Sequence, residues 1–192
     1  VWPLETLDGV ADTAKEAGLA THMDGARLLN ATIKSGVAAD RLAAGYDSCW
    51  IDFSKGLGAP VGAVLAGTKD FIAQAWRIKQ RSGGALRQSG VLAAMCLYAL
   101  DYNVDRLAED HALAAGIARR IVQLPGVSAV LPADTNIVIF DVAEDAPSAP
   151  EIEAALLKDG VIIGTFGERR IRVVTHLNVD PAGGDALCES MA

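Results

Sequence analysis

The sequence has 192 residues, of which 51% are hydrophobic and 21% are charged, so it can bury the core of one large or two small domains. Its formal net charge of −7 argues against nucleic acid or an anionic membrane surface as a partner, because both attract clustered Lys and Arg. Three distant cysteines without CxxC spacing predict neither a zinc site nor a disulfide framework, which fits a reducing cytoplasm.

The chain begins without Met and enters a helical pattern at once. Residues 4–17 have the apolar spacing of an amphipathic helix, and Gly18 stands where a glycine often ends one. Residues 19–23 are a strand-like stretch that ends at Asp24. We therefore expect the sequence to start inside a larger protein, with an N-terminal segment of the same protein as a missing partner.

A glycine-rich loop at residues 54–60 separates two apolar stretches, 47–53 and 61–66, which are predicted to be strands. A parallel crossover needs about a dozen residues or more. The short loop therefore predicts that the two strands are antiparallel neighbours in an otherwise α/β sheet.

The pattern then turns helical, with helices predicted at 68–81, 87–102 and 104–123. The longest apolar stretch, Gly90 to Leu100, is too short to cross a bilayer. The last part alternates short strands with helices, and these are predicted at 127–131, 137–142, 150–158, 161–164, 170–175 and 181–192. We expect a domain boundary inside the helical region, with residues 1–102 in a large domain and 103–192 in a small α+β domain.

One candidate site follows the first predicted strand. His22 and Asp24 face the same side of a strand, and Gly25 permits a sharp turn towards Arg27. Ligands of open α/β sheets bind at the carboxyl ends of strands, so Asp24 and Arg27 suit a heteroaromatic cation with an adjacent anion. The alternative is an aspartate that caps the next helix, with the arginine paired to it. No metal site is predicted, because no third ligand accompanies His22 and Asp24.

A second candidate is Lys55, which follows an apolar strand and precedes Gly56 and Gly58. We expect apolar surroundings that disfavour its ammonium form, as a Schiff-base amine requires. The glycines would let the backbone pass close to a flat ring. In a Walker A loop the lysine follows the glycines, so this loop is not one. A structural loop lysine is the alternative.

Further basic residues cluster near the end of the helix predicted at 68–81: Arg77, Lys79, Arg81 and Arg87. A solvated helix end and a site for an anionic small molecule both remain open for this cluster.

Together, the acid and the amine indicate a pyridoxal-phosphate enzyme, because that cofactor needs a lysine for its aldimine and an acid at its pyridine nitrogen. Four motifs, in the same order, resemble the L-threonine aldolase family, including its low-specificity and phenylserine-aldolase-like members. They are His22-x-Asp24-Gly25-Ala26-Arg27, Ser54-Lys55-Gly56-Leu57-Gly58-Ala59-Pro60-Val61-Gly62, Gly83-Gly84-x-x-Arg87-Gln88-x-Gly90 and Arg172-x-x-Thr175-His176.

The resemblance implies a role for each residue of the first half of the site. Lys55 would form the aldimine with pyridoxal 5'-phosphate, and Asp24 would partner the pyridine nitrogen. Arg27 would lie against the cofactor's phenolate oxygen or the substrate carboxylate. Arg87 would reach a phosphate, including one held by a neighbouring subunit.

In the second half, Arg172 would bind the substrate carboxylate, for which a planar bidentate donor is suited. A strand-edge salt bridge is the alternative. His176 completes the motif, and both a catalytic and a purely structural role remain open for it.

The resemblance also implies a fold and an activity. We expect a fragment of a fold-type I (aspartate aminotransferase-like) large α/β domain, followed by the small C-terminal domain. The activity would be reversible cleavage of a β-hydroxy-α-amino acid, such as L-threonine, L-allo-threonine or phenylserine, to glycine and an aldehyde. A cytoplasmic homodimer or homotetramer is expected. The rival hypotheses are an aminotransferase, a β-eliminating lyase, and a non-catalytic fragment.

The sequence departs from the family pattern in two places. Ala85 and Leu86 replace the commoner glycine and methionine before Arg87. The front part of the family, which carries the phosphate-binding turn and the ring that stacks on the cofactor, is absent from the sequence.

Overall fold

A computed structural model describes all residues of the chain, 1–192. It divides into two compact units, Val1–Asp105 and Arg106–Ala192. The division falls three residues after the boundary expected at residue 102. No helix of the chain is long and apolar enough to cross a membrane.

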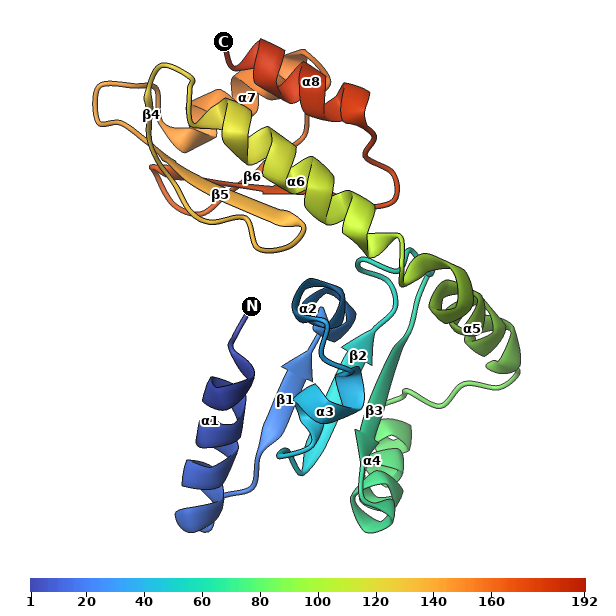
Figure 1. Cartoon of the computed structure of the whole chain (residues 1–192). Helices are drawn as coiled ribbons and strands as arrows, with labels where there is room; N and C mark the ends of the chain where they lie inside the picture. Colours follow the sequence, from blue (N-terminus) through green and yellow to red (C-terminus); the bar gives the residue numbers. More distant parts are fainter. The chain divides into compact units, whose positions relative to one another are not determined.

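The first unit contains a three-stranded sheet of order β1-β2-β3 (Figure 1). Strand β1 (His22–Gly25) runs parallel to β2 (Ser48–Asp52), and β3 (Ala63–Gly67) runs antiparallel to β2. The predicted antiparallel pairing on either side of the glycine-rich loop is therefore confirmed.

Five helices accompany this sheet: α1 (Leu4–Glu16), α2 (Leu28–Ser35), α3 (Ala39–Ala43), α4 (Lys69–Arg81) and α5 (Gly90–Asn103). A small apolar core forms where α2, α3 and β2 meet, and its buried members are Leu28, Leu42 and Cys49. By contrast, every residue of β3 is exposed, α4 has no buried residue, and α5 buries only Ala99.

The predicted start of the first strand was wrong. Gly18 has a positive φ of 69°, and the Leu19 amide donates to the Ala14 carbonyl at 2.8 Å. These residues complete the end of α1, as a glycine in the left-handed conformation commonly does, so the strand begins only at His22.

The second unit contains a four-stranded antiparallel sheet of order β4-β5-β7-β6. Its strands are β4 (Val127–Val130), β5 (Ile137–Val142), β6 (Gly164–Thr165) and β7 (Arg170–Val174), and its helices are α6 (Leu107–Ile121), α7 (Ala149–Lys158) and α8 (Pro181–Ser190). Alternate residues of β5 are buried, as expected for a strand with one face on a core. That core also takes Ile117 and Ile121 from α6, Leu156 from α7 and Leu187 from α8.

The strand predicted at 161–164 was misplaced. Gly160 has a φ of 78°, and the Val161 amide donates to the Leu156 carbonyl at 3.0 Å, so these residues end α7. The strand is therefore limited to Gly164–Thr165.

Candidate active site

Asp24 lies at the carboxyl end of β1, and its Cα partner on β2 is Trp50. Its carboxylate accepts a hydrogen bond from the Ala26 amide at 3.1 Å and is exposed. The N-cap residue of α2 is Arg27, and no side chain makes a capping hydrogen bond at this end of the helix. Asp24 therefore stabilises the turn after β1 rather than capping α2, and its carboxylate stays accessible at the sheet edge.

Gly25 allows β1 and β2 to approach each other at this edge. A Cβ atom at this position would lie 2.3 Å from the Trp50 carbonyl oxygen and 3.0 Å from the Cys49 sulfur. Any larger residue would force the strands apart, so glycine is required where β1 ends.

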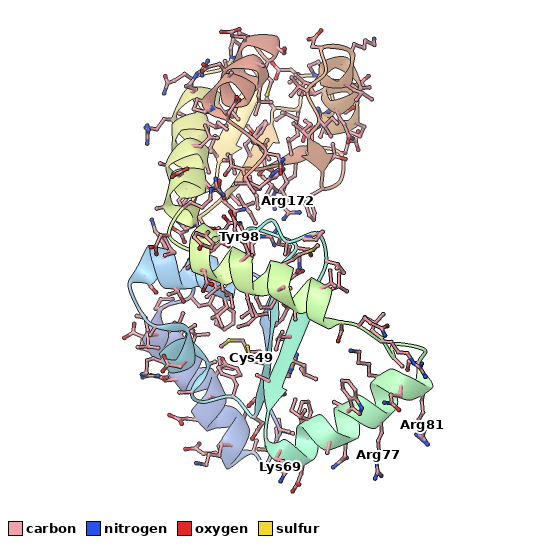
Figure 2. The ribbon with its side chains drawn as sticks, turned by 90° about the vertical axis from the view of Figure 1, so that its right-hand side faces the viewer. Cys49, Lys69, Arg77, Arg81, Tyr98 and Arg172 are labelled. Carbon is pink, nitrogen blue, oxygen red and sulfur yellow. The ribbon has the colours of Figure 1, made fainter.

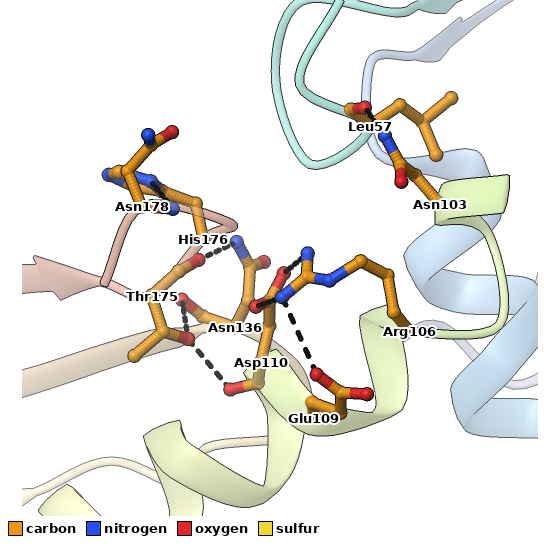
Figure 3. Close-up of polar contacts among 9 residues, drawn as sticks. All are labelled: Leu57, Asn103, Arg106, Glu109, Asp110, Asn136, Thr175, His176 and Asn178. Atoms are coloured by element: carbon orange, nitrogen blue, oxygen red, sulfur yellow. Dashed lines mark hydrogen bonds and ion pairs between the residues drawn. The ribbon is translucent and has the colours of Figure 1, made fainter. Parts of the chain in front are cut away.

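The loop that carries Lys55 is held by backbone hydrogen bonds. The Phe53 amide donates to the Gly62 carbonyl, and the Ala59 amide donates to the Phe53 carbonyl, both at 2.9 Å. Phe53 and Leu57 are buried, and the Asn103 side-chain amide donates to the Leu57 carbonyl at 2.7 Å (Figure 3). Lys55 therefore belongs to a loop whose backbone is fixed by hydrogen bonds and by two buried side chains.

The Lys55 ammonium has a polar partner. Its Nζ lies 3.1 Å from an Asp52 carboxylate oxygen and 5.0 Å from the centre of the Trp50 ring, and the side chain is 36% exposed. The prediction of apolar surroundings was wrong, because the carboxylate of Asp52, three residues earlier in the chain, pairs with the lysine.

Asp52 is itself fixed by the loop. Its second carboxylate oxygen accepts hydrogen bonds from the Ser54 amide at 2.8 Å and the Ser54 hydroxyl at 2.6 Å. Burial raises the pKa of the Asp52 carboxyl, but the Ser54 hydrogen bonds and the Lys55 ammonium together hold the pKa below its usual value. Asp52 is therefore an ionised anchor for the lysine.

Trp50 is a neighbour of both Asp24 and Lys55. It is the register partner of Asp24 and also the ring beneath Lys55. Asp24 and Lys55 are thus both neighbours of Trp50, one through the pairing of β1 with β2 and the other through its ammonium group. These residues fit a pyridine ring that carries an aldehyde, with an acid for the ring nitrogen and an amine for the aldehyde.

The sequence analysis missed Trp50 and Asp52. A signal for them was available, because residues 50 and 52 share one side of a strand that leads directly to Lys55.

The other two predicted site residues of the first unit, Arg27 and Arg87, have fewer recorded contacts with the rest of the site. Arg27 is half-buried at the start of α2. Arg87 is exposed in the segment between α4 and α5, next to Gln88, which has a strained positive φ of 52°. No hydrogen bond joins Arg87 to Asp24 or Lys55.

The basic residues of α4 point into solvent. Figure 2 shows Lys69, Arg77 and Arg81 extending from the helix, and all three are exposed. Lys79 covers the exposed Trp76 ring, with its Nζ 5.0 Å from the ring centre. This arrangement favours the solvated helix end over an anion site.

Arg172 belongs to the second unit, where two neighbouring arginines have different environments. Arg170 makes two hydrogen bonds to the Asp141 carboxylate, at 2.7 and 2.8 Å. Arg169 donates to the carbonyls of residues 143, 144 and 146. Arg172 makes no such bond, and its guanidinium lies over the Phe166 ring at 5.7 Å. The strand-edge salt bridge considered for Arg172 belongs instead to Arg170.

The chain after β7 is fixed by a buried polar network (Figure 3). The fully buried Thr175 hydroxyl donates to the Asp110 carbonyl at 2.7 Å, and the Asn136 side chain donates to the Thr175 carbonyl at 2.9 Å. His176 accepts the Asn178 amide at its Nδ1, at 3.3 Å. That turn occupies one ring nitrogen and leaves Nε2 for other contacts.

The solved structures that this chain resembles are fold-type I pyridoxal-phosphate enzymes, so the predicted α/β fold is confirmed. A family model described as "Beta-eliminating lyase" matches residues 1–145, and the chain belongs to this family. The family and its fold-type I neighbours depend on pyridoxal phosphate.

Curated relatives agree with the resemblance found in the motifs. The chain is 40% identical over 176 residues to a probable low-specificity L-threonine aldolase 2 of Arabidopsis thaliana, covering 91% of this chain and 50% of that protein. It is 39% identical over 179 residues to a low specificity L-threonine aldolase of Escherichia coli O157:H7, covering 93% of this chain and 52% of that protein. The chain thus spans about half the length of these relatives, and the resemblance to threonine aldolases is confirmed.

A solved structure has the same fold over the whole chain. It is a putative L-allo-threonine aldolase from Listeria monocytogenes, with a TM-score of 0.82 and 25% identity, covering 100% of this chain and 56% of that one.

Proposed function

We propose that this chain forms part of a pyridoxal-phosphate-dependent carbon–carbon lyase that cleaves β-hydroxy-α-amino acids, such as L-threonine, L-allo-threonine or phenylserine, to glycine and an aldehyde. The observation that carries the proposal is that Asp24 and Lys55 lie at the carboxyl ends of the neighbouring parallel strands β1 and β2. The names of the relatives support this choice over an aminotransferase.

The cofactor, when bound, supplies an electron sink for the bond that breaks. Lys55 would hold it through its aldehyde carbon. Asp24 would accept a hydrogen bond from the protonated ring nitrogen and keep the proton there. Arg27 would bind the phenolate oxygen, and Arg87 would bind the phosphate.

The substrate would meet residues of the second unit. Arg172 has donors that no carboxylate of the chain occupies, so it would bind the substrate carboxylate. His176 would exchange a proton with the substrate through Nε2, since Nδ1 accepts the Asn178 amide.

The proposal extends to the assembly. The exposed apolar residues of β3 and α5, among them Val64, Leu65, Leu97 and Tyr98, support a further segment of the same protein and a second copy as partners. A homodimer or homotetramer in the cytoplasm is the form we propose.

The decisive experiment combines two measurements on the full protein. Borohydride reduction followed by peptide mass spectrometry should fix the cofactor on Lys55. Incubation with threonine, allo-threonine and phenylserine should release the matching aldehyde without an added keto acid. Trapping without aldehyde release, but with amino transfer to a keto acid, would overturn the aldolase in favour of an aminotransferase. Absence of trapping would overturn the enzymatic proposal altogether.

A further inference from the structure

Phe166 is an exposed aromatic residue whose backbone is nevertheless fixed. It follows β6, and its amide donates to the Arg170 carbonyl at 2.8 Å, which continues the pairing of β6 with β7. The side chain is 59% exposed, so core packing does not explain a phenylalanine at this position.

The ring of Phe166 lies beneath the one arginine of this hairpin that has no carboxylate or carbonyl partner. The Arg172 guanidinium carbon is 5.7 Å from the ring centre, within the range of a cation–π contact. Arg169 and Arg170, in contrast, use their N–H groups on carbonyls and on Asp141.

A ring and a carboxylate hold a guanidinium in different ways. A carboxylate occupies the N–H donors at the edge of the guanidinium plane, whereas an aromatic face attracts the charge and leaves those donors available. A side chain that is already restrained also loses less conformational freedom when it binds a ligand.

We propose that Phe166 is a positioning residue for Arg172, and that its ring presents the guanidinium edge to a substrate carboxylate. This inference rests on the proposed function, because it assigns the substrate carboxylate to Arg172. It adds a residue outside the four family-like motifs and makes Phe166 a determinant of carboxylate recognition.

The kinetic test compares Phe166→Leu and Phe166→Tyr in the full protein. Leucine removes the aromatic face, and we expect KM for threonine to rise by about two- to fivefold with kcat unchanged, the size of an exposed cation–π contact. Tyrosine keeps the face and should restore KM. With 1-amino-2-propanol, which lacks the carboxylate, binding should be equal in wild type and Phe166→Leu. Leu131→Ala, a change at another exposed apolar residue of this unit, is the matched control and should leave KM unchanged.

A nuclear magnetic resonance test separates this inference from the activity. The ring should displace the Arg172 side-chain proton shifts in wild type, and the displacement should vanish in Phe166→Leu. Titration with glycine should move the Arg172 Nε–H signal, and titration with methylamine should not. An enzyme without aldolase activity that shows both effects would refute the proposed function alone. Absence of the ring shift, or equal effects of Phe166→Leu with and without the substrate carboxylate, would overturn the positioning role.

Discussion

The two units of this chain bury their apolar residues to very different degrees. In the second unit, three helices and a four-stranded sheet enclose Phe140, Ile121, Leu156 and Ile171, all at 1% exposure or less. In the first unit, β3 is exposed throughout and α5, a helix composed largely of apolar residues, buries only Ala99. The second unit has a large core, whereas the first has only a small one and carries the proposed cofactor-binding residues on a sheet with an exposed apolar strand.

The same contrast holds for the polar groups. The second unit buries Asp110, Asn136 and Thr175 and connects them to one another through hydrogen bonds. The first unit keeps Asp24 and Lys55 accessible at a sheet edge. Most of the buried core therefore lies in the second unit, whereas the residues proposed to bind the cofactor lie in the first, and the following experiments test that division.

The largest expected effect is that of Lys55→Ala, set against Arg172→Ala. Loss of the lysine should abolish the visible absorption of the bound cofactor and all turnover, because Lys55 is the residue proposed to attach the cofactor. Loss of Arg172 should keep the absorption and raise KM, since each charge-assisted hydrogen bond contributes about 1.5–3 kcal/mol. Absorption spectra and steady-state kinetics measure both. Retained absorption in Lys55→Ala would remove the chemistry from the first unit.

The next effect is that of Asp24→Asn. Asparagine keeps the shape of the turn but cannot hold the ring nitrogen protonated, so cofactor should stay bound while turnover falls by orders of magnitude. Cofactor retention after gel filtration and kcat are the measurements. An unchanged kcat would leave Asp24 only the role of stabilising the turn at Ala26.

Breaking the buried ion pair of the second unit should have a large effect on stability. Arg106 bonds Asp110, which is 2% exposed, at 2.9 Å (Figure 3). Arg106→Met should lower the free energy of unfolding by about 3 kcal/mol, because an unpaired buried carboxylate remains. Arg120→Met is the control, since its pair with Asp185 is exposed and should contribute little. Urea denaturation followed by circular dichroism distinguishes them, and equal losses would contradict the difference between a buried and an exposed ion pair within the second unit.

A matched pair of valines tests the two sheets directly. Val138 is fully buried in β5, and Val64 is 51% exposed in β3. In this chain alone, Val138→Ala should cost about 2 kcal/mol and Val64→Ala less than about 0.5 kcal/mol. In an assembled homo-oligomer the Val64 cost should rise. A Val64 cost that stays small in the assembly would show that nothing covers β3.

The smallest expected effect is on the stability of the fold at acidic pH. The bidentate hydrogen bonds from Arg170 hold the pKa of the Asp141 carboxyl below its usual value. A carboxyl with a lowered pKa in the folded state stabilises the fold above its unfolded pKa of about 3.9, and that contribution disappears as the pH falls through the folded pKa. Asp141→Asn should therefore flatten the loss of stability between about pH 5 and pH 2. Glu168→Gln, a change at an exposed acid of the same hairpin, is the control.

Much of the architecture could be predicted because it depends on local rules. Loop length alone gave the antiparallel direction of β3, and period-two alternation gave β5. The errors arose at helix ends, where Gly18 and Gly160 extend a helical turn into residues that have the composition of a strand. The hydrogen bonds of those turns decide the boundary, and apolar periodicity does not detect them.

The sequence predicted which residues form the candidate site, but it did not predict most of the side-chain contacts that these residues make. Asp24 lies at the end of β1 and Lys55 follows β2, so the parallel pairing of these strands places both residues at the same end of the sheet. The Asp52 partner of Lys55 and the Phe166 ring under Arg172 depend on turn geometry and side-chain rotamers. Sequence spacing does not specify either of these, and Phe166 follows a strand that was itself misplaced.

The uncovered surface of β3 and α5 has a consequence for biosynthesis. The first unit leaves the ribosome before the second, and residues 106–192 need roughly 4–17 seconds at about 5–20 residues per second. During that time, and afterwards until a partner of the kind proposed above covers them, an edge strand with the sequence Ala-Val-Leu-Ala-Gly and an apolar helix are accessible to other nascent chains. Translation speed and chaperone supply should therefore control the yield of active protein more strongly than the intrinsic stability of the second unit.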